Sequence, residues 1–498
     1  MEKRKYNYFL VLLKNLSFVV FLIPLLAFVF AFRSYSQVFL YSSYTGDEFI
    51  DNQWAIAKID LNKAWKIVTG SSNVKVGIID SGVDGIHEDL VDNINTSLSC
   101  AFNQFYTTGL EDLVNHGTNV AGIVGASGDN SIGISGVCWN VDLVSLRVAN
   151  ETNGDVDVDV VDDAITYANN NNIPIINMSF TDYNDHEDWE TALQGYNGLV
   201  VCAAGNLGQN LDNNPLNLKA YPACYSGPRI ISVGNSSSSD SIGASSNYGS
   251  VSVDLFAPGT AIYTTFPNDS YNGQSGTSMA APMVTGVAAL LLSIDPSLTA
   301  LQLRNAILNG VDTCSSFNGY CSTGGRLNAY KAALNVIPII PEQSTAVSYC
   351  SSSNFAKILR IECESSHYTL NFSGPSNYRV TLFKDARDTP IASVEYNDSS
   401  SHTLTFSSKL EQTVFVKVEN LSGNDGYFDA NVTAVSHDYT NSHILYDDYY
   451  HRSFCLCGAS ILKPHIFNFL NICVVCDPHA GPFFMNEDDV IFLEGGLI

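Results

Sequence analysis

The chain has few basic residues for its length. Its 498 residues include 24 Lys and Arg against 50 Asp and Glu, so the formal net charge is −26. Nucleic-acid binding depends on basic side chains that displace counterions from phosphates, so we expect no nucleic-acid partner. Disorder throughout is also excluded, because hydrophobic residues make up 45% of the chain and can form a large core. At roughly 150 residues per domain, the length predicts about three domains.

Long hydrophobic runs are also scarce, and after residue 36 we expect no segment that is apolar enough to span a membrane. The one candidate, residues 16–32, follows several basic residues and precedes the small residues Ser34 and Ser36. This arrangement is typical of an export signal that is cut after residue 36. We therefore expect a secreted, extracellular protein. Retention of residues 1–36 as a membrane anchor is the alternative.

Cysteine is not scarce, which agrees with export to an oxidising compartment. Eight of the 12 cysteines are scattered along the chain, as disulfide partners tend to be. Proximity in sequence predicts the pairs Cys314/Cys321, Cys350/Cys363, Cys100/Cys138 and Cys202/Cys224.

The other four cysteines lie in a C-terminal tail together with two histidines. The six candidate ligands are His451, Cys455, Cys457, His465, Cys473 and Cys476. Thiolates and imidazoles at such spacings suit a structural zinc ion with tetrahedral coordination. An exported protein also uses clustered cysteines for disulfides, so both interpretations stay open.

The apolar pattern predicts an α/β domain over residues 54–336, after a signal peptide (1–36) and a short leader (37–53). Continuous apolar strands alternate there with helical segments, which indicates a parallel sheet covered by helices on both faces. The expected strands are residues 74–79, 141–148, 173–177, 199–203 and 230–233, and the expected helices are residues 116–126 and 158–169.

The pattern changes after residue 337. Residues 340–436 contain alternating strands divided by polar turns, which predicts a small antiparallel β-sandwich. We interpret this domain as a spacer or stabilising unit, since no residue in it indicates binding of a substrate or a cell wall. Residues 437–498 form the Cys/His-rich C-terminal module.

Four polar residues lie where an α/β domain concentrates its chemistry. Asp80 and Asn206 each follow a predicted strand, and ligands gather beyond the carboxyl ends of such strands. His116 opens a helix and has a pKa suited to proton transfer. Ser278 begins another helix, whose start we place close to it because Pro282 is tolerated in a first turn. Each residue alone has a plain explanation as a turn, surface or cap residue. Together they supply a complete acyl-transfer set.

Three segments around these residues resemble the signatures of the subtilisin-like serine proteases (subtilases). They are residues 80–84 (DSGVD), 116–122 (HGTNVAG) and 276–282 (GTSMAAP). The resemblance implies a serine endopeptidase that hydrolyses proteins or peptides through an acyl-enzyme. Ser278 would be the nucleophile, His116 the general base and Asp80 its partner. Asn206 and the Ser278 main-chain N–H would bind the oxyanion.

The resemblance also implies a substrate-binding strand. Residues 176–180 are similar to the family's edge strand that pairs with an extended substrate. The implied substrate-binding residues are Asn177, Met178, Ser179 and Phe180. Thr181 stands where family members often have Gly, which raises the question of a narrower specificity pocket.

A calcium site is implied in the same way. Asp89 matches the family's calcium-binding aspartate, and residues 128–134 resemble its calcium loop, with Asn130, Ile132 and Ile134 as ligands. Amide, carboxylate and main-chain oxygens suit a hard cation.

One alternative belongs to a different functional class. It is an exported binding or surface protein in which the subtilisin-like domain is inactive. All four catalytic positions are filled, and this favours the enzyme.

Overall fold

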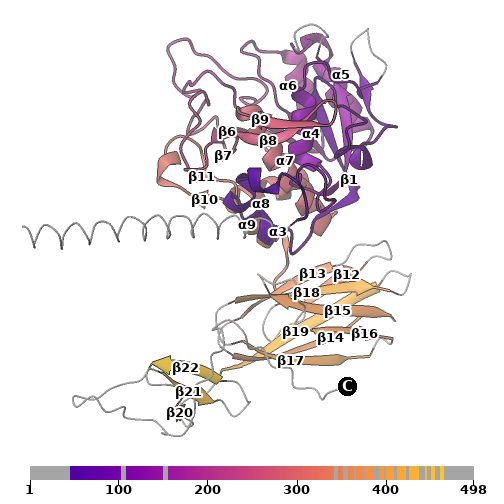
Figure 1. The fold of residues 1–498 in the computed structure, drawn as a ribbon, viewed down its shortest axis with the longest axis vertical. Coiled ribbons are helices and arrows are strands. Elements are labelled where there is room, and N and C mark those ends of the chain that lie inside the picture. The colour runs from indigo at the N-terminus through magenta and orange to yellow at the C-terminus, as the bar shows by residue number, and fades with distance from the viewer. Residues whose placement is uncertain are drawn as a thin grey trace, which may run out of the picture. The chain divides into compact units, whose positions relative to one another are not determined.

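The computed structural model describes residues 45–102, 108–149 and 155–340, and mainly the strands between residues 346 and 464. The predicted signal peptide, residues 1–36, lies outside the described residues. The chain divides into two compact units, the first built mainly from residues 69–290 and 299–329 and the second mainly from residue 330 onward (Figure 1). Each unit is described by itself.

A nine-stranded sheet forms the centre of the first unit. Its strand order is β10-β11-β7-β6-β5-β4-β1-β3-β2. All neighbours from β11 to β2 are parallel, and only β10 runs antiparallel. The strands are β1 (Gly70–Asp80), β2 (Cys100–Ala101), β3 (Asn140–Arg147), β4 (Ile175–Met178), β5 (Leu199–Ala203), β6 (Ile230–Ser236), β7 (Leu255–Pro258), β10 (Asp312–Thr313) and β11 (Gly325–Arg326). A separate antiparallel hairpin consists of β8 (Ile262–Phe266) and β9 (Ser270–Gln274).

Helices cover both faces of this sheet. Val144 and Leu146 of β3 pack with the buried residues of α5 and α6, whereas Val141 and Leu143 lie against Gly125 of α4. Successive residues of a strand point to opposite faces, so α4 lies on the face opposite to α5 and α6. The α-helices are α2 (Ala55–Lys58), α3 (Leu61–Ala64), α4 (His116–Gly125), α5 (Val161–Asn170), α6 (Glu187–Gly195), α7 (Thr277–Ile294), α8 (Ala300–Asn309) and α9 (Ala329–Val336). Short 3-10 helices are η1 (Ile50–Asn52), η2 (Val91–Asn93), η3 (Val158–Val160) and η4 (Ser315–Phe317).

The predicted α/β fold class is therefore confirmed, and each predicted strand overlaps an observed strand of the sheet. One expectation about hydrophobic runs is wrong. Helix α7 is long and apolar enough to cross a membrane by length and composition, and 94% of its apolar window is buried inside the protein. It is a core helix, whose hydrophobic surface is covered by its neighbours.

Strand β1 occupies the position in the sheet where the order of strand addition switches from one side to the other. After β1 the chain builds β2 and β3 on one side of it, and then β4 to β7 in order on the other side. Residues that follow the carboxyl ends of β1, β4 and β5 consequently meet at one edge of the sheet. In open parallel sheets this switch point is where ligands bind.

Residues 45–53 belong to the first unit, although the sequence pattern assigns them to the leader. The Asp47 carboxylate accepts hydrogen bonds from the main-chain N–H groups of Asp129 (2.9 Å), Asn130 (2.9 Å) and Ser131 (3.1 Å). The main-chain N–H of Phe49 donates to the carbonyl of Gly133 at 2.7 Å. This segment is therefore attached to the loop that the sequence identifies as a calcium loop.

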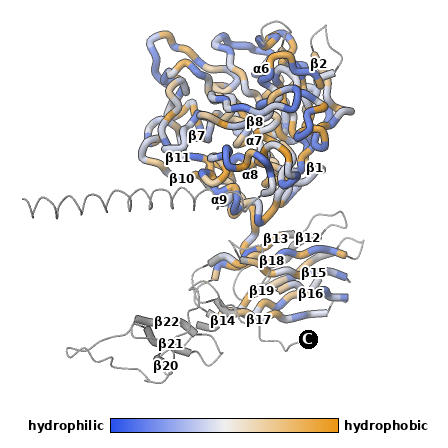
Figure 2. Tube along the Cα trace, in the orientation of Figure 1, coloured by the Kyte–Doolittle hydropathy of each residue, from blue (hydrophilic) through white to orange (hydrophobic). Residues whose placement is uncertain are grey.

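The second unit contains the predicted antiparallel sandwich. Its two four-stranded sheets have the orders β12-β19-β14-β17 and β13-β18-β15-β16. Leu370, Phe406 and Phe428 of the first sheet pack in one core with Leu359 and Val380 of the second. Hydrophobic and hydrophilic residues alternate along these strands (Figure 2), as expected when one face is buried. The strands are β12 (Ala346–Cys350), β13 (Lys357–Cys363), β14 (Ser366–Ser373), β15 (Tyr378–Lys384), β16 (Ala392–Tyr396), β17 (His402–Ser408), β18 (Gln412–Asn420) and β19 (Gly426–Ser436).

Part of the predicted Cys/His-rich module forms a small antiparallel sheet. It consists of β20 (His443–Leu445), β21 (Tyr450–Phe454) and β22 (Ser460–Pro464). Residue 451 lies on β21, opposite residue 463 of β22. The other five residues of the predicted zinc site, Cys455, Cys457, His465, Cys473 and Cys476, lie outside the described residues.

The predicted disulfides are not formed in this structure. Cys100, Cys202, Cys224, Cys314, Cys321 and Cys363 are free thiols, and these residues include at least one partner of each predicted pair. Several thiols are directed to main-chain carbonyls of their own turns. Cys314 Sγ donates to the Asp312 carbonyl at 3.4 Å and Cys321 Sγ to that of Gly325 at 3.8 Å. Short separation in sequence is therefore a poor guide to pairing here.

Replacement of Gly117 by Ala should destabilise the first unit. A β-carbon at Gly117 would lie 2.0 Å from the main-chain oxygen of Gly82, and a backbone atom cannot move aside as a side chain can. We expect Gly117→Ala to lower the free energy of unfolding by about 1–3 kcal/mol. Gly195→Ala is the matched control, since a β-carbon at this helical position meets nothing within 4 Å. Denaturant unfolding would measure both, and equal stability of the two variants would contradict the close packing of α4.

Candidate active site

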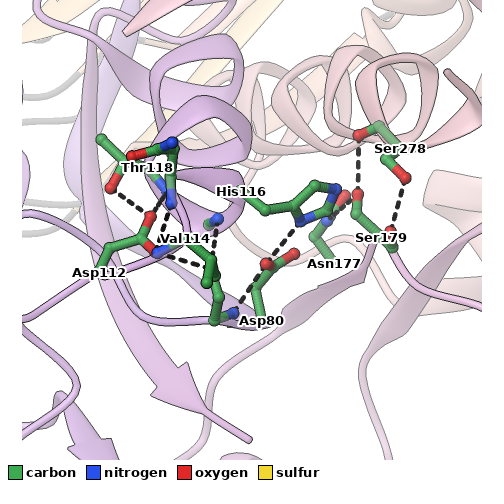
Figure 3. Close-up of polar contacts among 11 residues, drawn as sticks. Asp80, Asp112, Val114, His116, Thr118, Asn177, Ser179 and Ser278 are labelled. Atoms are coloured by element: carbon green, nitrogen blue, oxygen red, sulfur yellow. Dashed lines mark hydrogen bonds and ion pairs between the residues drawn. The ribbon is translucent and has the colours of Figure 1, made fainter. Parts of the chain in front are cut away.

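Asp80 is the last residue of β1 and is buried, with 3% of its surface exposed. Its Oδ1 accepts hydrogen bonds from the main-chain N–H of Ser81 and from Nδ1 of His116, both at 2.7 Å (Figure 3). Because Nδ1 carries the donated proton, Nε2 of a neutral His116 is left as a proton acceptor. This is the orientation that a general base needs.

The carboxylate of Asp112 holds the turn that leads into His116. It accepts five hydrogen bonds from groups around the start of α4. The donors are the main-chain N–H groups of Val114 (3.2 Å), Asn115 (3.0 Å) and Thr118 (2.8 Å) and the hydroxyls of Thr118 (2.6 Å) and Ser81 (2.9 Å). Asn115, directly before the histidine, has a left-handed φ of 73°, so the chain needs this support. Sequence reasoning missed Asp112, although an aspartate shortly before a helix is a known start signal.

The surroundings of His116 favour its protonated form. Burial of the ring lowers its pKa, but the charge and hydrogen bond of Asp80 and the charge of Asp112 outweigh this effect. The pKa of His116 is therefore raised above its usual value of 6.5. The side chain remains 37% exposed, so a substrate can reach it. Two carboxylates stabilise the imidazolium that forms when the base takes a proton.

Ser278 is the second residue of α7 and lies close to Ser179. Its Oγ donates to the carbonyl oxygen of Ser179 at 2.7 Å, and its own carbonyl accepts from the Ser179 hydroxyl at 2.9 Å. In Figure 3 the His116 imidazole lies between Asp80 and this pair of serines. Rotation about χ1 of Ser278 would release the hydroxyl from Ser179 for transfer of its proton.

Pro282 does not lie in the first turn of its helix, contrary to the prediction. Helix α7 begins at Thr277, so Pro282 is inside the helix, in its second turn. Proline has no N–H, and the carbonyl of residue 278 therefore loses its usual partner four residues later. The Ser179 hydroxyl donates to this carbonyl in its place. A side chain from outside the helix thus makes the internal proline acceptable.

A buried hydrogen-bond chain continues from Ser179 into the core. Asn177 Nδ2 donates to Ser179 Oγ at 2.9 Å, and Thr285 Oγ1 donates to Asn177 Oδ1 at 2.8 Å. All three side chains are almost inaccessible to solvent. The chain links two turns of α7 to the end of β4 through buried polar groups.

The structure places the first three residues of the predicted substrate strand, 176–178, inside the sheet, whereas Ser179 and Phe180 lie beyond the end of β4. Strand β4 pairs with β1 on one side and with β5 on the other, so it is an interior strand and offers no free edge. Asn177 and Met178 are completely buried, and Phe180 packs on Trp189 with ring centroids 5.8 Å apart. Among the four predicted residues, Ser179 is the one that contacts Ser278 directly. The sequence pattern of β4 reflects burial on both faces.

Asn206 follows β5 and is fixed in orientation by Thr277. Its Oδ1 accepts from the main-chain N–H of Thr277 at 2.9 Å and from the Thr277 hydroxyl at 3.1 Å. The amide oxygen is thereby occupied, which leaves the Nδ2 hydrogens of this exposed residue as donors for a ligand. The structure thus brings Asp80, His116, Ser278 and Asn206 to the same edge of the sheet, where β1, β4 and β5 end.

The predicted calcium ligands gather around a buried carboxylate. Asp89 is fully buried and accepts from Asn130 Nδ2 at 3.0 Å and from the Ile134 main-chain N–H at 2.8 Å. Burial raises the pKa of Asp89 to about 7, and the charges of Asp47 and Glu88 contribute to this rise. A bound cation would offset this repulsion. The Asp89 carboxylate therefore fits a hard cation in charge, whereas the Asn130 amide oxygen accepts from the Ile132 main-chain N–H at 2.8 Å and would have to turn toward the ion.

Comparison with known proteins agrees with this site. The model of the subtilase family (Peptidase S8) matches residues 71–335. Thermitase of Thermoactinomyces vulgaris is 36% identical over 287 residues, which are 57% of this chain and 96% of that protein. Subtilisin DY of Bacillus licheniformis is 37% identical over 239 residues, 47% of this chain and 82% of that protein.

Other relatives are matched over a smaller share of their length. The chain spans 64% of a thermophilic serine proteinase of Bacillus sp. strain AK1, at 35% identity over 272 residues and 54% of this chain. Among solved structures, a protease from Pseudoalteromonas arctica matches with a TM-score of 0.52 and 26% identity, over 59% of this chain and 99% of that one. By its family model, its relatives and its fold, the chain belongs to the subtilase family and is a serine-type endopeptidase.

Proposed function

We propose that this protein is a secreted endopeptidase that cleaves proteins and peptides through an acyl-enzyme on Ser278. One observation carries the proposal. His116 donates from Nδ1 to the buried Asp80 at 2.7 Å, at the edge of the sheet that also holds Ser278 and Asn206. A nucleophile, a base with an ordered partner and an amide donor are together what acyl transfer requires.

In the proposed first half-reaction, Ser278 Oγ attacks the scissile carbonyl carbon while His116 Nε2 takes the hydroxyl proton. Negative charge then develops on the carbonyl oxygen. Asn206 Nδ2 and the Ser278 main-chain N–H donate to this oxygen. When the intermediate collapses, the C–N bond breaks, His116 returns its proton to the leaving amine, and the acyl group remains as an ester on Ser278.

In the second half-reaction a water molecule attacks the ester carbonyl. His116 takes a proton from the water, and the same donors hold the new oxyanion. Cleavage of the ester bond releases a carboxylic acid, and the proton returns from His116 to Ser278 Oγ. Asp80 stabilises the imidazolium in both halves.

We also propose that Asp89 and the loop of residues 128–134 hold a structural calcium ion. Asp89 and Asn130 would supply side-chain oxygens, and Ile132 and Ile134 main-chain oxygens. When bound, the ion supplies positive charge beside the Asp89 carboxylate, which is fully buried. Its contribution is to the stability of the loop and of the attached residues 45–53.

Export and the state of the C-terminal tail stay as predictions from the sequence. The pattern of residues 1–36 supports secretion, with a retained anchor as the alternative. The tail ligands from His451 to Cys476 support either structural zinc or disulfides. No observation in the described part of the chain favours a binding protein without activity.

Replacement of the nucleophile tests the proposed reaction. Ser278→Ala should fold normally and lower peptide hydrolysis by a factor of at least about 10⁴, because the variant cannot form the ester. It should also fail to react with a fluorophosphonate probe. Ser238→Ala, which removes an exposed serine hydroxyl, is the matched control and should retain activity and labelling. Retained peptide hydrolysis by Ser278→Ala would contradict the assignment of Ser278 as the nucleophile.

The pH dependence of hydrolysis should report the raised pKa of His116. Only the neutral imidazole can take the proton of Ser278, so kcat/KM falls as the pH drops through this pKa. Because Asp80 and Asp112 raise the pKa, the midpoint of this acid limb should lie above 6.5. A kcat/KM profile at constant ionic strength would measure it. A midpoint at or below 6.5 would contradict the described surroundings of His116.

Chelation tests the proposed calcium ion. EDTA should lower the melting temperature by about 5 °C or more, because a ligand bound only to the native state stabilises it. Asp89→Asn should abolish the difference between calcium and EDTA, whereas the exposed Asp92→Asn should preserve it. Melting curves of the unmodified protein that coincide in calcium and in EDTA would exclude the ion.

A further inference from the structure

The position of the substrate follows from the proposed function, on which this inference rests. The attacked carbonyl must lie between Ser278 Oγ and the amide of Asn206. Ser278 touches Ser179, which follows β4, and Asn206 follows the neighbouring strand β5. The substrate residue that bears this carbonyl therefore lies beside two adjacent segments, residues 179–183 and 203–206. What fills the space between them decides which side chains fit.

Thr181 reaches across from the first segment to the second. Its hydroxyl donates to the carbonyl of Ala203 at 3.4 Å. Its Cγ2 lies 3.3 Å from the point that a β-carbon of Gly205 would occupy. A branched side chain thus stands against the backbone of the opposite segment, where a glycine would leave open space.

Tyr183 occupies the same region from further along the first segment. Its Oη lies 2.9 Å from the β-carbon position of Gly205, closer than Thr181. The hydroxyl accepts from Asn247 Nδ2 at 3.3 Å. The phenol is consequently held against Gly205, the residue before Asn206.

The backbone that carries Tyr183 is also held in place. Asp182 and Tyr221 exchange two main-chain hydrogen bonds, with N–O distances of 2.9 and 2.8 Å. Displacement of the tyrosine by a bulky substrate side chain would break these bonds or the contacts of its hydroxyl. Tyr183 is therefore held at two places, by the main chain of Asp182 before it and by the hydroxyl at the end of its ring.

We infer that Thr181 and Tyr183 restrict the substrate residue before the scissile bond to small side chains, namely glycine, alanine or serine. An aromatic or long aliphatic side chain would need the space that these two residues fill. Thr181 and Tyr183 determine specificity, and neither takes part in bond cleavage. The substrate class is thus a protein or peptide with a small residue at the cleaved position.

Two peptides that differ only at this position, alanine against phenylalanine, test the inference. We expect the unmodified enzyme to cleave the alanine peptide with a kcat/KM higher by roughly tenfold or more. The double variant T181G/Y183A should shift the ratio toward phenylalanine by about tenfold or more. The single variant Thr181→Gly should shift it in the same direction by less, and it serves if the double variant does not fold.

Tyr320→Ala is the matched control. Tyr320 is a tyrosine of the same unit that is 42% exposed and packs on Tyr248. This variant should leave the ratio unchanged.

The outcomes separate this inference from the proposed function. Equal cleavage of both peptides by the unmodified enzyme, or preference for phenylalanine, would overturn the small-residue pocket while leaving the acyl-enzyme intact. A ratio that stays constant in both variants would do the same. If the enzyme cleaves neither peptide and the fluorophosphonate does not label Ser278, the proposed function fails, and this inference fails with it.

Discussion

The arrangement of the catalytic site depends on the hydrogen bond between Asp80 and His116. It requires a carboxylate at the end of an interior strand, and a helix that begins within reach of it. Gly117 allows this approach, because a β-carbon there would meet the main-chain oxygen of Gly82. Asp112 then holds the left-handed turn at Asn115. The close approach of α4 to Gly82 and the hydrogen bonds of Asp112 are thus both needed to place His116 beside Asp80.

The serine is held by a different means. Pro282 removes the N–H that would pair with the carbonyl of Ser278, and Ser179 supplies a hydroxyl to that carbonyl. The nucleophile is consequently tied to the end of β4 as well as to its own helix. Since Asn177 and Thr285 complete this chain of buried hydrogen bonds, its geometry depends on the core and not on the surface. A rigid support of this kind keeps a catalytic group in place.

Much of the catalytic domain could be predicted from the sequence because its signals are local. Apolar runs mark the buried parallel strands, and Asp80, His116 and Ser278 lie in short segments with family signatures. The contact between Asp80 and His116 joins the last residue of β1 to the first residue of α4.

The features that were missed depend on contacts between distant residues. Asp112 gains its role from donors around the start of α4, and the tolerance of Pro282 depends on Ser179, about a hundred residues earlier in the chain. The interior position of β4 follows from strand order, which local composition does not encode. Cysteine pairing likewise depends on where side chains point, and Cys314 and Cys321 face main-chain carbonyls instead of one another.

Asp47 ties the start of the catalytic domain to a distant loop. Its carboxylate gathers three consecutive main-chain N–H groups of residues 129–131, which no other side chain in the described residues is seen to bind. A proteolytic cut on the C-terminal side of Asp47 would detach this clamp and leave those groups to solvent. The conformation of this loop therefore depends on a single carboxylate that lies more than eighty residues earlier in the chain.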